Sequence, residues 1–135
     1  MKTHRYVLLL GSSLASPQVL RLAAELLSAH GLVEATSRCV AGPSISIGDT
    51  RRFHNQALVL ATSLASDALV PLLKAIESEL GRTPGDPQCV IDIDLACECD
   101  AHGIVLWRDD AKLKHPLFVS LMQDVLDQLR GIATP

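Results

Sequence analysis

The sequence predicts an α+β fold, in which an antiparallel sheet is flanked by helices in the order βαββαββα. Three observations indicate this architecture. Short apolar or alternating runs, typical of strands, are interspersed with segments whose apolar residues recur at helical spacing. The helical segments have lengths suited to covering an antiparallel sheet. Hydrophobic residues make up 48% and charged residues 20% of the 135 residues, and we expect residues 1–135 to form one packed domain.

The N-terminal segments predict a central strand followed by a helix. The continuous apolar run 7–10 ends at Gly11, as expected of a strand covered on both faces. Ser16 and Pro17 form a typical helix start, an N-cap oxygen followed by a proline at the first helical position. Gly31 marks the end of this helix.

Two further strands follow the first helix. Residues 33–39 and 54–62 are rich in apolar side chains and are the predicted strands. Between them, residues 41–43 break the pattern, and the small residues of segment 44–50 predict a loop that could lie over a site.

The C-terminal half predicts two helices around a hairpin. Residues 66–81 have helical spacing, and Pro71 should either delay the start of this helix or kink it. The alternating segment 90–99 and the short run 104–107 predict a β-hairpin, which is followed by an amphipathic helix over 118–129. The resulting sandwich has ferredoxin-like character.

Residues 90–99 alternate acidic and apolar side chains at a period of two. In a strand, alternate side chains share a face, so the apolar set should face a core: Ile91, Ile93, Leu95, Cys97 and Cys99. The acidic set should share the other face: Asp92, Asp94 and Glu98. Asp92 and Asp94 then lie roughly 6.6 Å apart along the strand, close enough to converge on a divalent cation. The alternative is an amphipathic strand with a solvated acidic face.

Composition restricts the possible partners and location. A net charge of -3 with one Trp and one Tyr argues against a nucleic-acid surface. No apolar run approaches the ~20 residues that span a bilayer, and the N-terminus lacks the features of a signal peptide. The four cysteines show no disulfide framework, so we expect a cytoplasmic protein, with Cys97 and Cys99 as small core residues rather than zinc ligands.

Five short segments occur in a specific order: LGSSLASP at 10–17, FHNQA at 53–57, IE and LGR within 76–82, IDIDL at 91–95, and HP followed by FV within 115–119. Together they resemble the 6-hydroxymethyl-7,8-dihydropterin pyrophosphokinases of folate biosynthesis. The resemblance implies an antiparallel sheet flanked by helices. It also implies transfer of the β,γ-diphosphate of ATP to the hydroxymethyl oxygen of the pterin, with release of AMP.

The resemblance further implies a role for individual residues. Two Mg²⁺ ions would be held by Asp92 and Asp94, whose hard carboxylate oxygens suit this ion. The flat pterin would lie between two rings beside an amide, in a pocket shaped by two backbone positions: Phe53, Phe118, Asn55, Gly11 and Pro43. The nucleotide would be bound by Glu77, Arg82 and His115, of which Arg82 and His115 would also serve catalysis. Alternatively, the two Phe residues are ordinary core and His115 is a surface histidine before a helix.

The sequence departs from this family on the nucleotide side. Two expected arginine positions are occupied by Pro84 and Cys89, and the segment after His115 is shortened. Five basic residues lie in segments that could face the site: Lys112, Lys114, Arg108, Arg51 and Arg52. The leading hypothesis is therefore a magnesium-dependent pyrophosphokinase that uses ATP and a hydroxymethyl pterin. The alternatives are a non-catalytic pterin- or nucleotide-binding paralogue that has lost the phosphate-handling arginines, and a protein that binds neither ligand.

Overall fold

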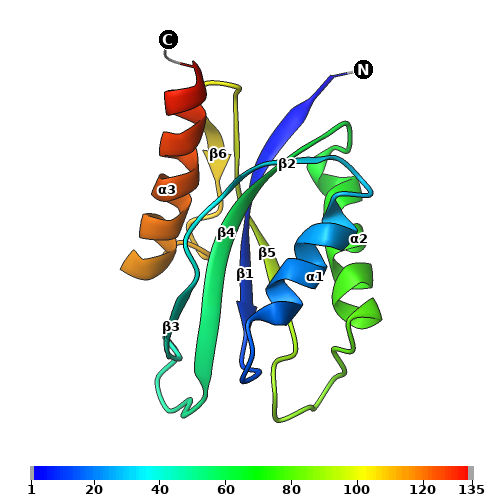
Figure 1. Ribbon diagram of the computed structural model, residues 1–135, viewed down its shortest axis with the longest axis vertical. Helices are drawn as coiled ribbons and strands as arrows, with labels where there is room; N and C mark the ends of the chain where they lie inside the picture. The colour runs from blue at the N-terminus through cyan, green and yellow to red at the C-terminus, as the bar shows by residue number, and fades with distance from the viewer. Residues whose placement is uncertain (1, 134–135) are drawn as a thin grey trace.

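The computed structural model describes residues 2–133. In this part of the chain the elements are β1 (His4–Ser12), α1 (Gln18–Leu27), β2 (Leu32–Thr36), β3 (Val40–Pro43), β4 (Arg52–Thr62), α2 (Ser66–Glu79), β5 (Asp92–Cys99), β6 (Val105–Arg108) and α3 (Pro116–Ala133). The strands form one antiparallel sheet in the order β2-β4-β1-β5-β6, and β3 also pairs with β4. Helices α1 and α2 cover one face of the sheet and α3 covers the other (Figure 1). The predicted α+β fold is confirmed.

Strand β1 contributes to two separate cores. Its side chains alternate, so that Tyr6, Leu8 and Leu10 pack with residues of α1 and α2, whereas Val7 and Leu9 pack under α3. All five are buried. The apolar run 7–10 is therefore part of a central strand that is covered on both faces, as predicted.

Within residues 2–133, no helix is long and apolar enough to cross a membrane.

The boundaries of α1 differ from the predicted ones. The helix begins at Gln18, so Pro17 occupies the N-cap position predicted for Ser16, and it ends at Leu27, before Gly31. Ser16 still contributes to the start, because the Gln18 amide donates a hydrogen bond of 3.2 Å to Ser16 Oγ.

Helix α2 begins at Ser66 and contains Pro71, so the proline does not delay the start of this helix. Gly81, which follows α2, has a φ of 106°, a left-handed conformation that glycine adopts at little cost.

The structure adds one strand to the predicted order, which becomes βαβββαββα. Strand β2 ends at Thr36 rather than at residue 39, and the predicted break at 41–43 is part of β3. Strand β4 is longer than its partner β2, and β3 pairs with the first four residues of β4, which β2 does not reach. The extra strand thus supplies hydrogen-bond partners to the backbone of β4.

A β-bulge interrupts the alternation in β5. Val7 of β1 pairs with Cys97, but the next residue, Leu8, pairs with Leu95, so Ala96 is the extra residue. Both Ala96 and Cys97 lie in the core under α3. One extra residue in a strand moves every following side chain to the opposite face.

The bulge corrects the predicted distribution of side chains on β5. Asp92 and Asp94 share a face as predicted, but Cys97 and Cys99 lie in the core under α3, not in the core that contains Ile93. Glu98 pairs with a residue of the other core, and so it does not share the face of the two aspartates. The uniform two-residue alternation predicted for 90–99 is therefore wrong after residue 95.

Glu98 is buried by partners on neighbouring strands. His4 Nδ1 lies 2.7 Å from Glu98 Oε2, and Trp107 Nε1 donates a 3.0 Å hydrogen bond to Glu98 Oε1. Both carboxylate oxygens thus have partners, which is what a buried carboxylate requires.

Replacing Glu98 tests its position after the bulge. We expect Glu98→Ala to lower the free energy of unfolding by about 1–3 kcal/mol, because His4 and the indole N–H lose their acceptor. The matched control is Glu79→Ala, at an exposed glutamate of α2, with an expected change within about 0.5 kcal/mol. Urea denaturation measures both. Equal stability of the two variants would show that Glu98 is on the solvated face that the simple alternation predicts.

Candidate active site

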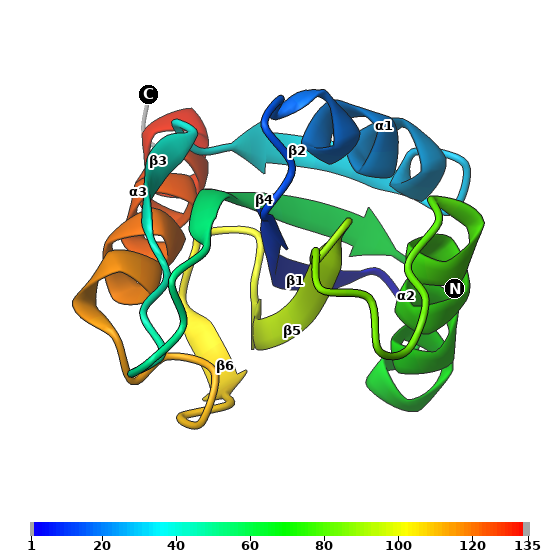
Figure 2. The same cartoon turned by 90° about the horizontal axis from the view of Figure 1, so that it is seen from below.

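A cavity of about 800 Å³ lies at one end of the sheet. β1 ends there, and β4 and β5 begin there, because both pair antiparallel with β1. The remaining walls come from the C-terminal part of α2, the first turn of α3, and the β3–β4, α2–β5 and β6–α3 connections, which Figure 2 shows from this end of the molecule. Segments distant in sequence therefore supply the side chains of one site.

The cavity brings together most of the residues that the sequence singles out. Nine of them line it: Gly11, Phe53, Asn55, Glu77, Arg82, Asp92, Asp94, His115 and Phe118. Pro43 is exposed at the end of β3 and is outside this lining. Of the five basic candidates, Arg51, Lys112 and Lys114 line the cavity, whereas Arg52 and Arg108 do not. Pro84 and Cys89 are also part of the wall.

Two aromatic rings and an amide form one part of the wall. Asn55 lies on β4 directly opposite Gly11 of β1. A Cβ atom on Gly11 would lie 3.0 Å from Asn55 Oδ1 and 3.9 Å from Phe53 Cδ2, so only glycine allows this close approach without displacing the amide. Phe118 lies in the first turn of α3 and packs partly against the core, whereas neither core of the described chain includes Phe53. Ordinary core packing thus does not account for Phe53.

The two aspartates at the start of β5 are held by cations from different connections. Arg82 Nη1 lies 2.9 Å from Asp92 Oδ1, and Lys112 Nζ lies 3.0 Å from Asp94 Oδ1. Arg82 Nη1 also lies 3.0 Å from Glu77 Oε2. The same Glu77 oxygen accepts a 2.7 Å hydrogen bond from the amide of Ile93. Glu77 is only 3% exposed and thus fixes both the β5 backbone and Arg82.

The two carboxyl groups differ in their affinity for protons. Burial and the neighbouring charge of Asp92 raise the pKa of Asp94 to about 6. Burial opposes ionisation of Asp92 too, but hydrogen bonds from Asp94 and Arg82 hold the pKa of Asp92 below its usual value. The pair therefore concentrates negative charge near neutral pH. A cation bound at this site would relieve the repulsion between the two carboxylates.

The donor set suits Mg²⁺ bound together with a phosphate ligand. Within residues 2–133 there is no group of three or more His, Cys, Asp or Glu side chains that could hold a metal ion alone. Mg²⁺ is usually bound through one or two carboxylates, with water and substrate phosphates as its other ligands. Asp92 and Asp94 provide that number of carboxylates beside a cavity large enough for a substrate.

Comparison with known families agrees with this geometry. A family model described as 7,8-dihydro-6-hydroxymethylpterin-pyrophosphokinase matches residues 7–123, which include every predicted site residue. The chain belongs to this family. It is accordingly a pterin pyrophosphokinase of folate biosynthesis, as the order of motifs indicates. Comparison with individual curated proteins gives no match.

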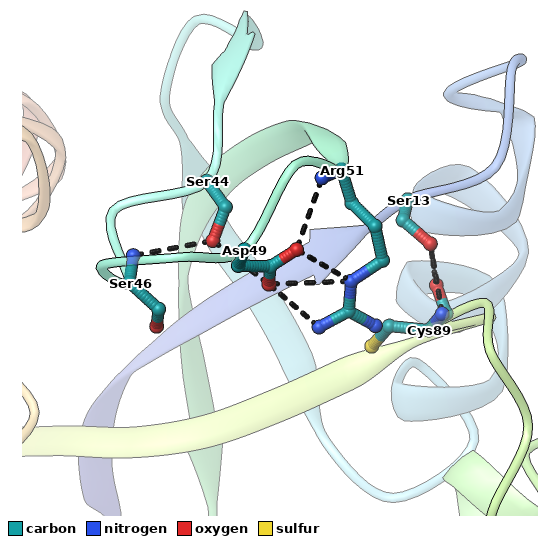
Figure 3. Close-up of polar contacts among 6 residues, drawn as sticks. All are labelled: Ser13, Ser44, Ser46, Asp49, Arg51 and Cys89. Carbon is teal, nitrogen blue, oxygen red and sulfur yellow. Dashed lines mark hydrogen bonds and ion pairs between the residues drawn. The ribbon is translucent and has the colours of Figure 1, made fainter.

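Further hydrogen bonds in this pyrophosphokinase hold the walls of the cavity in place. Ser13 Oγ accepts a 2.8 Å hydrogen bond from the Cys89 amide (Figure 3), and the Ser13 amide donates a 2.8 Å hydrogen bond to the Cys89 carbonyl. These bonds fix the α2–β5 connection to the end of β1. On the opposite wall, Asp49 binds Arg51 through both carboxylate oxygens. The sequence singles out Arg51 and Cys89 and includes Ser13 in its first motif, whereas the only signal for Asp49 is the small-residue loop at 44–50.

The raised pKa of Asp94 predicts how cation binding depends on pH. A carboxylate must lose its proton to bind Mg²⁺, so we expect the Mg²⁺ affinity of the pyrophosphokinase to fall about tenfold per pH unit below about pH 6. Calorimetric titration with Mg²⁺ in the presence of the unreactive analogue α,β-methylene-ATP, at about pH 7 and about pH 5, measures the change. Asp94→Asn is the control and should bind Mg²⁺ weakly at both values. Equal affinity of the wild-type enzyme at both pH values would contradict this assignment.

Proposed function

We propose that this pyrophosphokinase binds Mg²⁺-ATP and 6-hydroxymethyl-7,8-dihydropterin together in the 800 Å³ cavity, with Asp92 and Asp94 as the metal ligands. One observation supports this most strongly. The same cavity joins a partly buried carboxylate pair, flanked by cations, to a wall of two aromatic rings and an amide. A reaction between a polyphosphate and a flat heterocycle requires both a phosphate-binding part and a ring-binding part in one cavity.

The aromatic wall suits the pterin. Phe53 and Phe118 can stack on a flat ring, and the Asn55 amide can both donate and accept hydrogen bonds at its polar edge. Gly11 leaves the space that keeps the Asn55 amide in place. Asn55 is 8% exposed and lines the cavity, so its amide is positioned to meet a ligand there.

The carboxylate end suits the triphosphate. Asp92 and Asp94 would hold Mg²⁺, which would supply positive charge to the phosphate groups during the transfer. Arg82 and Lys112 already lie beside the two aspartates, from which they can turn to phosphate oxygens. His115 Nδ1 accepts a 3.1 Å hydrogen bond from the Leu117 amide, which places the proton on Nε2. That N–H can donate to a phosphate oxygen.

The reaction that these groups support is displacement at the β-phosphorus of ATP. The hydroxymethyl oxygen of the pterin forms a bond to this phosphorus and loses its proton. The bond from the β-phosphorus to the oxygen bridging the α- and β-phosphates breaks, and AMP leaves with that oxygen. The residues of the cavity mainly orient the reactants and stabilise charge.

The four cysteines are free thiols, in keeping with the cytoplasmic location predicted from the sequence.

The test of this proposal is formation of AMP and pterin diphosphate. We expect the wild-type enzyme to release AMP from Mg²⁺-ATP only when the hydroxymethyl pterin is present. Chromatography measures the AMP formed. Asp94→Asn should lower kcat by about 10²-fold or more, because a ligand for the bridging cation is lost. Asp110→Asn is the matched control and should leave kcat unchanged, since Asp110 is outside the cavity and pairs with Arg108. Tight pterin binding without AMP formation would instead support the non-catalytic paralogue.

A further inference from the structure

Arg51 occupies a defined position in the wall of the cavity. Asp49 holds its guanidinium through three hydrogen bonds, two from Nε at 2.9 and 3.2 Å and one from Nη2 at 2.7 Å. Ser44 Oγ donates a 3.0 Å hydrogen bond to Asp49 and so fixes the carboxylate in turn. Figure 3 shows this chain of contacts along the β3–β4 connection. The guanidinium is therefore oriented although its side chain is 40% exposed.

The other edge of this guanidinium is available to a ligand. Within residues 2–133, Nη1 of Arg51 has no hydrogen-bond acceptor, and the group points across the cavity toward Cys89 (Figure 3). The guanidinium carbon lies 5.1 Å from the centre of the Phe53 ring, a cation–π distance. Arg51 is thus located between the proposed ring-binding wall and the connection that leads to Asp92.

A simple surface ion pair does not explain this arrangement. Exposed pairs contribute about 0–1 kcal/mol to stability and need no contact with a cavity. Arg108 and Asp110 are such a pair, outside the cavity. Arg51 differs because it lines the cavity, and because contacts with Asp49 and Phe53 together fix the direction of its guanidinium. A planar guanidinium that is anchored along one edge presents its other N–H groups to oxygens in a fixed geometry.

We propose that Arg51 is a further catalytic residue that binds the diphosphate as it passes from ATP to the pterin. Its Nη1 group donates hydrogen bonds to oxygens of the transferred group, while Asp49 keeps the guanidinium aimed across the cavity. Two other cations of the wall, Arg82 and Lys112, are paired with the metal-binding carboxylates, whereas Arg51 is paired outside that cluster. This inference rests on the proposed function, because it assigns a phosphate contact within the same cavity.

The position of Cys89 suggests an exchange experiment. Cys89 faces the Arg51 guanidinium from the opposite wall, and its sulfur lies beside that guanidinium (Figure 3), so removing the Arg51 side chain would free space next to Cys89. An arginine at position 89 can therefore bring a guanidinium to this space from the other side. Restored activity in such a double variant requires a guanidinium at this place, whereas a purely structural role of Arg51 in its own loop would not be rescued from the opposite wall.

The kinetic test compares Arg51→Ala with its neighbour. We expect Arg51→Ala to lower kcat by about 10²-fold, a typical loss for a group that stabilises transferring charge. Arg52→Ala is the matched control, since Arg52 is exposed and outside the cavity, and should stay within about twofold of wild type. The double variant Arg51→Ala/Cys89→Arg should recover at least about tenfold of the loss. Unchanged kcat in Arg51→Ala would overturn the proposal.

A binding measurement separates this inference from the proposed function. Calorimetric titration with inorganic pyrophosphate and Mg²⁺ should show at least about tenfold weaker binding to Arg51→Ala than to Arg52→Ala. If the wild-type protein forms no AMP, the proposed function fails, but this difference in affinity still tests Arg51. Should Arg51→Ala not fold, Arg51→Lys replaces it, with a loss of about tenfold expected because lysine cannot bind Asp49 and phosphate in the same geometry. Equal pyrophosphate affinity in the Arg51 and Arg52 variants would overturn the proposal.

Discussion

The close approach of two partly buried carboxylates at the start of β5 is the constraint on which the site depends. Asp92 and Asp94 share one face of a strand, and burial with mutual repulsion raises the pKa of Asp94 to about 6. Cations must therefore accompany the pair. Arg82 comes from the connection after α2 and Lys112 from the connection before α3. The carboxylate pair thus draws to one place the two segments that also line the cavity.

Strand β5 serves the site and the core with different parts of its length. Before the bulge, its even-numbered residues place carboxylates at the cavity. After the extra residue Ala96, the face under α3 receives Cys97 and Cys99 instead. Without the bulge, the carboxylate of Glu98 would lie on that face and require a partner under α3. The bulge therefore allows one strand to carry an acidic site and still support the helix that supplies Phe118.

Local patterns predicted the parts of the fold that depend on local structure. The run 7–10 indicated a central strand, and the order of short motifs indicated the family and nine of the residues that line the cavity. The bulge at Ala96 was not predictable, because a small apolar residue fits either face and only pairing with β1 decides its place. Strand β3 depends on the unpaired length of β4. The choice of Arg51 over its neighbour Arg52 depends on which side chain the loop turns inward, and this is a property of the tertiary structure.

The most direct test of the central claim is cation binding measured with and without nucleotide. Mn²⁺ in place of Mg²⁺ allows the free ion to be counted by electron paramagnetic resonance. Because Arg82 and Lys112 neutralise the aspartates in the absence of substrate, we expect weak Mn²⁺ binding alone and at least about tenfold tighter binding with the unreactive analogue α,β-methylene-ATP. The double variant Asp92→Asn/Asp94→Asn should lose this increase. If the double variant bound Mn²⁺ and the analogue as tightly as the wild-type enzyme, the two aspartates would not be the metal site.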